Sequence, residues 1–390
     1  MKEIIIEGKY TTAKCFTVDN EANAIDTHAR AQIKMICDDE ITKDSIIRIM
    51  PDVHAGKVGP IGLTIKLGHN RIIPNLLGND LGCGISVFKL DIRKRKLTDS
   101  DFNKLDKLIR DKIPSGSSIR SEGDRYIDKD YDLLFDHLNV PINKLRILRS
   151  MYTLGGGNHF IEVGKNDSDE YFLTIHSGSR SLGPVINDYY NRQGQDILKK
   201  KGVEVPYEMT YLEDDLFSNY VSDVSVATAF ARSSRHGIAS IISDGMKWIR
   251  ESEVSIPHNY FDTTRNTLHK GASGYFEWGE LGLKKYETIY IPINMKDGIL
   301  YGKPVENTDW NCSFPHGSGR LIPRSEIANL ATVSSFKKEM KGIFSTSIGK
   351  DTLDESPFAY RRIDELKDAV SGVIELEGVI TPVYNFKAGD

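Results

Sequence analysis

Short apolar segments that end in glycine- or histidine-containing loops recur along this chain of 390 residues. Six such segments, all brief and rich in β-branched residues, span 3–8, 45–51, 85–92, 172–178, 288–295 and 378–386. Runs of this length are typical of buried strands, because a helix is usually longer. The sequence therefore predicts sheets whose strand ends carry loops, and loops on a rigid scaffold are where proteins present reactive groups.

Longer amphipathic segments alternate with these strands. They predict helices over 97–113, with Thr98 or Ser100 as the cap, and over 225–249 and 323–342. Strands and helices follow one another in an irregular order, unlike the regular alternation of a doubly wound sheet, so we predict the α+β class. No internal repeat or Pro- and Ser-rich linker marks a boundary, and the prediction is one domain over residues 1–390.

The composition is that of an ordinary soluble protein, with 39% hydrophobic and 27% charged residues. No apolar run approaches the length of a membrane span, and the apolar stretch before Glu7 is too short for a signal peptide. We therefore expect a cytoplasmic protein without a membrane partner. The four cysteines form no CxxC pair and are expected to be reduced. Because the net charge is −4, binding of RNA would require locally concentrated basic residues.

Several side chains at predicted strand ends could ligate a metal. Four of the ten histidines stand beside Gly, Ser or Asn at strand or turn boundaries: His159, His176, His258 and His316. Together with Asp80 and Cys83 of the segment NDLGCGI, they form a set of nitrogen, oxygen and sulfur ligands that suits a divalent transition metal such as Mn or Zn. The alternative is that these side chains never meet and each has a structural role. Their wide separation along the chain leaves both interpretations open.

The segment LGGGNHF could approach a phosphate through its glycine amides, although it matches neither GxGxxG nor the P-loop pattern. Asn158 and Glu162 flank His159 and could bind a sugar hydroxyl, a base edge or a metal-bound water. The alternative for both is a turn or cap role. Arg180, in HSGSR, is of the residue type that makes bidentate phosphate contacts, and its alternative is a surface arginine.

His316 lies in a glycine-rich segment with no acid beside it in the sequence. Such a histidine, close to arginines, is well placed to be a nucleophile toward a phosphoryl group. Arg320 and Arg324 follow at four-residue steps and would share one face if a helix begins here, where they could neutralise phosphoryl oxygens. The alternative is an ordinary turn before the helix predicted near Pro323. Lys387, next to the C-terminus, is by itself only a tail lysine.

Taken in order, the motifs of this chain resemble those of the RtcB family of GTP- and manganese-dependent RNA ligases. The resemblance covers nearly the whole chain and rests on MPDVHAGKVGPIG, GNDLGCGI, KIPSGS, LGGGNHFIEV, IHSGSRSLG, PHNYFD, LHKGA, HGSGR, DESPFAYRRIDE and the terminal FKAG. It implies a single RtcB-like domain with mixed β-sheets surrounded by helices and a central metal and nucleotide cleft.

The resemblance also implies a site with two Mn(II) ions. Carried over by motif, its ligands are Asp80, Cys83, His159, His176 and His258. In that arrangement the Cys83 thiolate bridges both ions, and the glycines around it make room for the ions and a triphosphate. The resemblance thus predicts that these side chains meet in space and bind metal, which their spacing in the sequence left open.

By the same resemblance, the nucleophile of the reaction is His316, which takes GMP from GTP. The GMP then moves to an RNA 3′-phosphate, and a 5′-hydroxyl displaces it from the RNA–ppG end; a 2′,3′-cyclic phosphate is first hydrolysed to the 3′-phosphate. The implied nucleotide contacts are Asn158 and Glu162 with the guanylate, Lys387 with guanine, Tyr360 near the base, and Arg320 and Arg324 with phosphate. A role in RNA repair or tRNA splicing follows from the resemblance, without a known need for an accessory protein.

The chain departs from the family pattern at two places and is short for the family. PINM (292–295) stands where Pro-Gly-Ser-Met is usual, and CSFPHGSGR places Phe314, Pro315 and Ser318 in unusual positions. We expect these changes to reshape the base pocket or the RNA entrance, as in a divergent bacterial-type paralogue. Two rival functions remain: a metal-dependent RNA-end phosphoesterase that does not ligate, and a catalytically silent RNA-binding paralogue.

Overall fold

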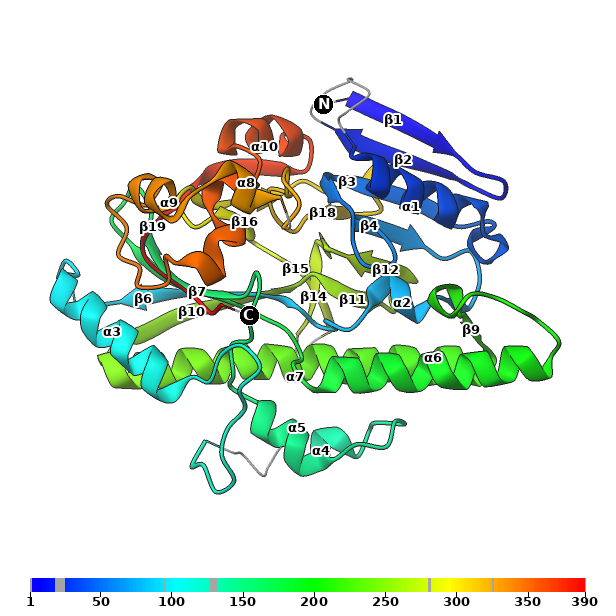
Figure 1. Ribbon diagram of the computed structural model, residues 1–390, viewed down its shortest axis with the longest axis horizontal. Coiled ribbons are helices and arrows are strands. Elements are labelled where there is room, and N and C mark those ends of the chain that lie inside the picture. Colours follow the sequence, from blue (N-terminus) through cyan, green and yellow to red (C-terminus); the bar gives the residue numbers. More distant parts are fainter. Residues whose placement is uncertain are drawn as a thin grey trace.

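The computed structural model describes residues 2–17, 25–93, 95–126, 132–279, 282–324 and 326–389 (Figure 1). Within these residues, sheets and helices are mixed in irregular order, which confirms the α+β class. The α-helices are α1 (Thr27–Asp38), α2 (Pro74–Leu77), α3 (Asp99–Lys112), α4 (Asp132–Phe135), α5 (Lys144–Ser150), α6 (Leu182–Lys200), α7 (Asp214–Met246), α8 (Ile327–Leu330), α9 (Val333–Glu339) and α10 (Ile363–Val370).

A seven-stranded sheet forms the centre of the molecule. In spatial order its strands are β10 (Ile249–Pro257), β6 (Gly84–Asp91), β8 (Tyr171–Ser177), β7 (Phe160–Lys165), β19 (Ile374–Lys387), β17 (Gly298–Pro304) and β16 (Ile289–Asn294). Every neighbouring pair in this sheet is antiparallel. Strands that are far apart in the sequence lie side by side in this sheet. For example, β19, near the C-terminus, pairs with β7, which comes from the middle of the chain.

A six-stranded sheet lies beside it and carries the N-terminal strands (Figure 1). Its order is β1 (Lys2–Glu7), β2 (Thr12–Thr17), β3 (Ile46–His54), β4 (Ile61–Lys66), β12 (Thr267–Lys270) and β11 (Asn259–Asp262), with β2 and β3 parallel. Three two-stranded sheets complete the described strands: β13 (Ala272–Gly274) with β18 (Ser313–Pro315), β14 (Phe276–Gly279) with β15 (Gly282–Lys285), and β5 (Arg71–Ile72) with β9 (Leu212–Glu213).

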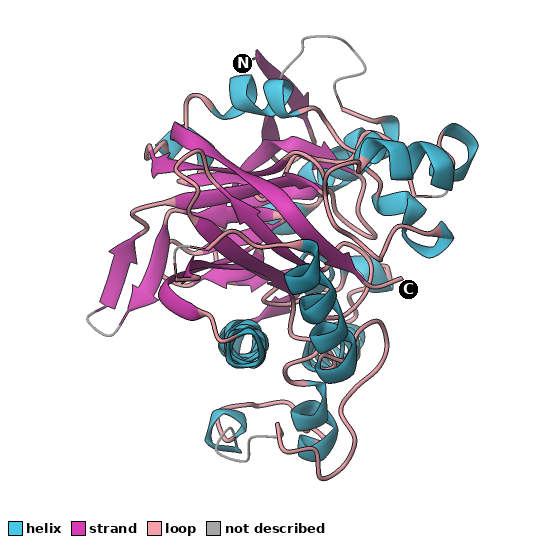
Figure 2. Cartoon of the chain, turned by 90° about the vertical axis from the view of Figure 1, so that its left-hand side faces the viewer, coloured by secondary structure: helices cyan, strands magenta, loops and turns pink. Residues whose placement is uncertain are grey.

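The two large sheets share a hydrophobic core, and helices cover their other faces. One face of β6 contributes Ile85 and Val87 to the core that also holds Phe16 of β2. The opposite face contributes Phe88 and Leu90 to a second core, shared with α3 and α7. Helices α6 and α7 run along one side of the molecule, and α4 and α5 lie beyond them (Figures 1 and 2). The seven-stranded sheet is thus buried on both faces, which makes its strand ends rigid supports.

The six segments predicted as strands are β1, β3, β6, β8, β16 and β19, and all six are confirmed. Helix α3 is also confirmed, with Thr98 as its N-cap in a capping box with Asp101. The helix predicted over 225–249 begins earlier, at Asp214. The segment 323–342 forms two short helices, α8 and α9, because Ala331 between them adopts an extended backbone. None of the described helices combines the length and apolarity needed to cross a membrane.

Candidate functional site

The candidate metal ligands gather at one edge of the seven-stranded sheet because its neighbouring strands run antiparallel. The start of each strand then lies beside the end of the next. In register, Phe160 pairs with both His176 and Lys387, and Gly84 pairs with Pro257. Five candidate residues therefore come to this edge from five strands: Cys83 precedes β6, His159 precedes β7, His176 is the second-last residue of β8, His258 follows β10 and Lys387 ends β19.

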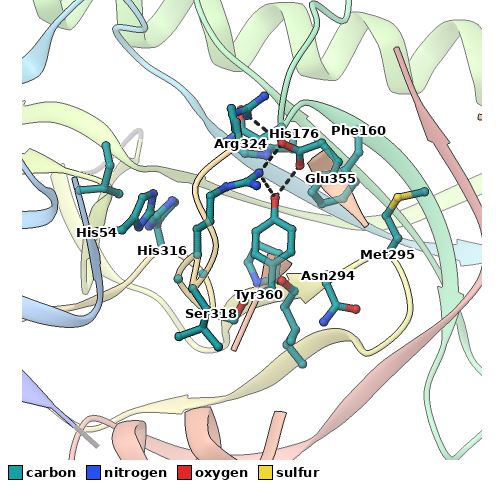
Figure 3. Close-up of a pocket in the computed structure, with 18 of the residues that line it drawn as sticks. His54, Phe160, His176, Asn294, Met295, His316, Ser318, Arg324, Glu355 and Tyr360 are labelled. Atoms are coloured by element: carbon teal, nitrogen blue, oxygen red, sulfur yellow. Dashed lines mark hydrogen bonds and ion pairs between the residues drawn. The ribbon is translucent and has the colours of Figure 1, made fainter. Parts of the chain in front are cut away.

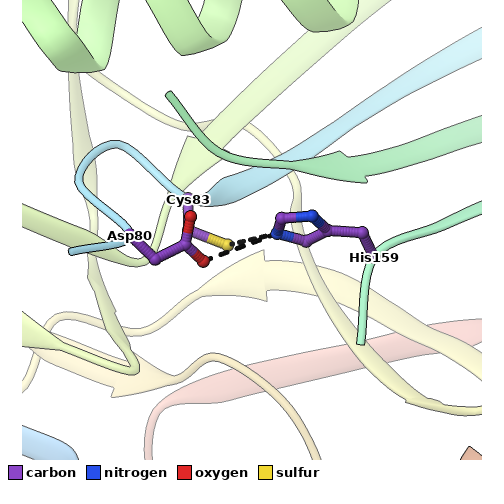
Figure 4. Close-up of side chains that lie close together, drawn as sticks. All are labelled: Asp80, Cys83 and His159. Carbon is purple, nitrogen blue, oxygen red and sulfur yellow. Dashed lines mark hydrogen bonds and ion pairs between the residues drawn. The ribbon is translucent and has the colours of Figure 1, made fainter. Parts of the chain in front are cut away.

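Asp80, Cys83 and His159 present three donor atoms that lie within 4.8 Å of one another (Figure 4). His159 Nε2 is 3.4 Å from Asp80 Oδ2 and 3.6 Å from Cys83 Sγ. On the other side of the thiol, His176 Nε2 is 3.2 Å from Cys83 Sγ. The sulfur atom is therefore central, between two imidazoles and next to a carboxylate. This placement fits a thiolate that contacts more than one ion.

The histidines continue as a row from this cluster toward His316. Ring centroids are 5.3 Å apart for His159 and His176, 5.4 Å for His176 and His258, and 5.2 Å for His258 and His316. Burial, followed by the neighbouring histidines, holds the pKa of His176 and His258 well below the usual value. These rings are therefore neutral and offer lone pairs, as metal ligation requires.

Buried polar atoms without partners show that the cluster is not satisfied by the protein alone. His258 Nδ1 forms a hydrogen bond with Ser273 Oγ at 3.0 Å. The buried Nε2 of the same ring has no hydrogen-bond partner among the described residues. Burial raises the pKa of the Cys83 thiol well above its ordinary value, and the charge of Asp80 adds to the rise. A metal would displace this proton, because ligands bind as thiolates. The donor set and the unpartnered nitrogen both fit a divalent transition metal.

The glycines next to Cys83 have a different role from the one expected. A Cβ on Gly82, which has φ of +68°, would lie 2.7 Å from the Thr228 backbone of α7, and one on Gly84 would lie 2.4 Å from the Ile256 carbonyl oxygen of β10. They therefore allow close backbone packing and do not make room for ions and a triphosphate. The glycine that clears space at the ligands is Gly178, where a Cβ would lie 2.0 Å from Asp80 Oδ1.

A buried guanidinium donates hydrogen bonds to the backbone beside two of the candidate metal ligands. Arg235 of α7 is 1% exposed and donates to the carbonyl oxygens of Gly82 at 3.1 Å and Ser177 at 2.8 Å. These two residues directly adjoin Cys83 and His176. Arg235 therefore ties two ligand-bearing strand ends to the long helix, and its charge favours the thiolate form of Cys83. Arg235 lies in the segment ARSSRHG, and nothing in that local sequence predicts this role.

His316 does have an acidic neighbour, contrary to the expectation from the local sequence. Its Nδ1 is 2.6 Å from Oδ2 of Asp52, a fully buried residue of β3 that also accepts from the Gly317 amide at 3.3 Å. A carboxylate can only accept, so the proton resides on Nδ1 and the lone pair on Nε2. Gly319, with φ of +78°, permits this contact, because a Cβ there would lie 2.7 Å from Asp52 Cα.

A cavity of about 690 Å³ extends from His176, the one candidate metal ligand among its lining residues, to His316 and the end of the C-terminal strand. Figure 3 shows His54 and His316 on one side of it and His176 near Phe160 and Glu355, with Tyr360 between the two groups. This volume lies within the range of small-molecule sites, roughly 300–1,000 Å³. All six predicted nucleotide contacts line the cavity: Asn158, Glu162, Arg320, Arg324, Tyr360 and Lys387.

Polar atoms at one end of the cavity could read a nucleobase. Burial raises the pKa of Glu162 to about 8, although the amide of Asn385 donates to its Oε2 at 2.8 Å. The other oxygen, Oε1, and the side-chain oxygen of Asn385 have no hydrogen-bond partner among the described residues. Lys387 Nζ approaches the Asn158 carbonyl oxygen at 3.4 Å. This end therefore combines acceptors with an ammonium donor.

Arg320 and Arg324 do not share a helix face as the four-residue spacing suggested. Arg320 forms an isolated β-bridge with Tyr360, and no helix includes either arginine. They converge instead on Glu355, to whose Oε1 they donate at 2.7 and 2.8 Å. Arg324 also pairs with Asp354 at 2.7 Å. Both guanidiniums are thus already engaged with carboxylates.

The two departures from the family pattern lie at the cavity wall. Residues 292–295 line it at the end of β16, and the Ser318 hydroxyl donates to the Ile293 carbonyl oxygen at 2.8 Å. Phe314 is fully buried, and its ring stacks on Tyr275 with centroids 5.5 Å apart. Residues 292–295 and Ser318 therefore form part of the wall near His316, whereas Phe314 packs behind it, and the expected change to the base pocket stays a prediction.

Neutral imidazoles, a thiol and a carboxylate define a candidate metal centre, and a carboxylate-oriented histidine beside it is a candidate nucleophile. In the comparison with known proteins, the model of the family described as tRNA-splicing ligase RtcB matches residues 34–144 and 141–388. The chain therefore belongs to the RtcB family.

Curated relatives match along most of their length. The chain is 27% identical to the RNA-splicing ligase RtcB of Escherichia coli strain K12 over 365 residues, which cover 85% of this chain and 87% of the relative. It is 28% identical to the RNA-splicing ligase RtcB2 of another Escherichia coli strain, with 87% and 85% covered. The tRNA-splicing ligase RtcB of Nanoarchaeum equitans is 24% identical, with 82% of each chain covered.

Sequence reasoning assigned no role to two residues that organise the site. Asp52 precedes His316 by 264 positions, and only its place at a strand end in MPDVH hinted at a role. Glu355, in DESPFAY, accepts from four side chains, yet nothing local distinguishes it from its neighbour Asp354. Both act through contacts that span long stretches of the chain.

Proposed function

We propose that this chain is a GTP-dependent RNA ligase that joins RNA 3′-phosphate or 2′,3′-cyclic phosphate ends to 5′-hydroxyl ends. The observation that carries the proposal is His316: Asp52 fixes its Nδ1, which leaves the Nε2 lone pair for attack, and the residue borders both the metal cluster and the cavity. We further propose that residues 1–390 act as one RtcB-like domain.

The proposed first step is attack of His316 Nε2 on the α-phosphorus of GTP. A phosphorus–nitrogen bond forms, the bond to the β-phosphate oxygen breaks, and pyrophosphate leaves. Asp52 stabilises the ring while positive charge develops on it, as carboxylates do for catalytic histidines. An oxygen of the RNA 3′-phosphate then attacks the same phosphorus, which frees His316 and forms RNA–ppG. The 5′-hydroxyl oxygen finally attacks the RNA phosphate and releases GMP.

The proposed ligands of two Mn(II) ions are Asp80, Cys83, His159, His176 and His258, whose donor atoms converge at the sheet edge. When bound, such ions supply Lewis-acid polarisation of phosphoryl oxygens and neutralise the charge on leaving groups. Arg235 holds the backbone that carries Cys83 and His176 in place. Metal selection in the cell depends on supply as well as ligand type.

The base of GTP is proposed to bind at the end of the cavity that holds Glu162, Asn158 and Lys387. Guanine offers the N1 and N2 hydrogens as donors, which Glu162 Oε1 accepts when the carboxyl is ionised, and O6 as an acceptor for the Lys387 ammonium. Tyr360, Arg320 and Arg324 also line the cavity, and the two arginines are the proposed phosphate contacts. Each arginine would share its charge between phosphate and the carboxylates that hold it.

An RNA-joining assay tests the proposal. The purified chain is loaded with manganese and given GTP and two RNA fragments, one with a 2′,3′-cyclic phosphate or 3′-phosphate end and one with a 5′-hydroxyl. We expect a joined product that requires GTP and is lost in His316→Ala. A 3′-phosphate without joining, unaffected by His316→Ala, would identify the phosphoesterase instead. RNA binding with no altered ends would identify the silent paralogue. Either result would contradict the ligase proposal.

A further inference from the structure

One buried carboxylate organises the nucleotide end of the cavity. Glu355, at the end of the 3₁₀ helix Lys350–Glu355, is 2% exposed. Its Oε2 accepts from Lys387 Nζ at 2.7 Å and from the Tyr360 hydroxyl at 2.5 Å. Its Oε1 accepts from the guanidiniums of Arg320 and Arg324 at 2.7 and 2.8 Å (Figure 3).

We propose that Glu355 is a positioning residue that sets the preference for guanine by orienting Lys387 and Tyr360. This inference rests on the proposed use of GTP and extends it to a residue that does not itself need to touch the nucleotide. The two oxygens of Glu355 contact different groups. Oε2 accepts from Lys387 and Tyr360, the proposed base contacts, and Oε1 accepts from the two arginines proposed to contact phosphate. Moving one carboxylate would therefore disturb base recognition first through Lys387 and Tyr360.

The surrounding cations keep Glu355 in its ionised form. Burial alone would raise its pKa, but Lys387, Arg320 and Arg324 lower it by more, so the pKa lies well below the usual value. A buried charge persists only when paired and hydrogen-bonded, and here all four contacts are charge-assisted or donate to the ionised form. Glu355 is thus ionised at neutral pH, and both of its oxygens act as acceptors.

The contact with Glu355 restricts how Lys387 can recognise a base. An ammonium group has three donors and no acceptor. One donor of Lys387 is taken by Glu355 and a second approaches Asn158 O at 3.4 Å, which leaves a third without a hydrogen-bond acceptor among the described residues. That donor complements the O6 carbonyl of guanine and is repelled by the amino group that adenine carries at the same position.

Tyr360 is fixed by the same carboxylate. Burial raises its pKa well above the usual value, and the charge of Glu355 adds to the rise, so the phenol remains a donor to Glu355. Its ring also lies 4.9 Å from the Arg320 guanidinium in a cation–π contact. Among the described residues, loss of the acceptor at position 355 would leave the phenol oxygen only its hydrogen bond with Arg320, at 3.1 Å, and the ammonium only that with the Asn158 carbonyl oxygen, at 3.4 Å, so the site would lose part of its fixed geometry for the base.

The test compares three variants for GTP use and for discrimination against ATP. Glu355→Gln keeps the size and removes the charge, Glu355→Asp keeps the charge, and Glu377→Gln is the control at an exposed glutamate of β19 outside the cavity. Formation of protein-bound GMP is measured against GTP concentration, with ATP as competitor. For Glu355→Gln we expect the half-saturating GTP concentration to rise, and the preference for GTP over ATP to fall, by about tenfold or more. The rate at saturation changes far less.

The control and the conservative variant distinguish positioning from a purely structural role. Glu377→Gln is expected to change both quantities less than about threefold, as for an exposed ion pair. Glu355→Asp should retain more of the GTP preference than Glu355→Gln does. Equal loss of saturating rate and thermal stability in both Glu355 variants, with unchanged base preference, would overturn the inference.

Equilibrium dialysis of GTP and ATP separates this inference from the proposed function. If the wild-type protein forms no GMP adduct, the covalent step is wrong, and dialysis with the same variants still measures base preference. A wild-type preference for GTP that falls in Glu355→Gln supports the inference. The same preference in both proteins, or none in the wild type, contradicts it.

Discussion

The metal end and the nucleotide end of the cavity are built in different ways. The metal ligands stand at the ends of central strands, over cores shared by sheets and long helices. At the nucleotide end, Lys387 also ends a central strand, β19, but Glu355 and its other partners lie on short helices and turns beside a small core formed by side chains such as Phe336 and Met340. The metal end thus depends on the sheet alone, whereas the nucleotide end also depends on ion pairs.

The state of the polar atoms differs in the same way. At the metal end, His258 Nε2 and His159 Nδ1 are buried without hydrogen-bond partners among the described residues. At the nucleotide end, Glu355 already pairs with three cations. The comparison indicates that the metal end is preformed and incomplete without ligands. At the nucleotide end the contacts of Glu355 are satisfied and must exchange on binding, while Glu162 Oε1 and the side-chain oxygen of Asn385 have no partner among the described residues. Substitutions should therefore abolish function at the first end and retune affinity at the second.

The largest effect is expected for Cys83→Ala. The thiol lies between His159 and His176, so its loss removes the central ligand of the metal cluster. We expect bound manganese, GMP adduct and RNA joining all to fall to background, as measured by elemental analysis and by the two activity assays. Cys312→Ala, at a half-buried cysteine outside the cluster, is the matched control. RNA sealing by Cys83→Ala near the wild-type rate would refute the bridging role.

The next effect is expected for Asp52→Asn. The amide no longer holds the proton of His316 on Nδ1, and loss of such an orienting carboxylate slows catalysis by about 10²- to 10⁴-fold. Single-turnover formation of the GMP adduct measures this loss. Bound manganese should remain unchanged, because Asp52 contacts His316 and the Gly317 amide. An adduct rate within threefold of wild type would show that the carboxylate is not needed to orient the ring.

A smaller effect is expected for Lys387→Ala at the nucleotide end. One charge-assisted donor to the base is lost, so GTP affinity should weaken by about ten- to a hundredfold. Titration of GTP measures the affinity, and elemental analysis should show wild-type manganese. Lys303→Ala, at an exposed lysine of β17, serves as control. Unchanged GTP affinity in Lys387→Ala would remove this lysine from the site.

The smallest effect is a pH dependence from Glu162. Its pKa is raised from 4.5 to about 8 in the folded protein, so the native state retains a proton that the unfolded chain releases. The free energy of unfolding contributed by this group should therefore decrease as the pH rises from about 4.5 through about 8. Urea unfolding of the wild type and Glu162→Gln across this range measures the difference. A constant difference between the two proteins would contradict the burial of an uncharged Glu162.

Local patterns predicted the strands well because each is short, apolar and bounded by turns. The start of α7 was missed, since the acidic residues at 213–215 mask the helix that continues from Leu216 and Phe217 into the expected segment. The split of 323–342 was also missed, because helical spacing alone does not show where a cap interrupts it.

The candidate site was predictable as a set of residue types but not as a geometry. Spacing offered histidines and a cysteine, whereas their convergence follows from the order β10-β6-β8-β7-β19, which depends on long-range pairing. The motif resemblance supplied the ligand set and the nucleotide contacts that local reasoning had left open. Neither local spacing nor the motif resemblance predicted the roles of Asp52 and Glu355, because their partners lie far away in the sequence.

The most direct test of the account is whether His316 becomes covalently guanylylated. The protein, loaded with manganese, is incubated with GTP labelled in the α-phosphate, denatured and examined for bound label, with His316→Ala as control. The account predicts label that is acid-labile, alkali-stable and absent from the variant, as expected of a phosphoramidate at Nε2. No label on fully metal-loaded protein, or equal label on His316→Ala, would contradict the central role of this histidine.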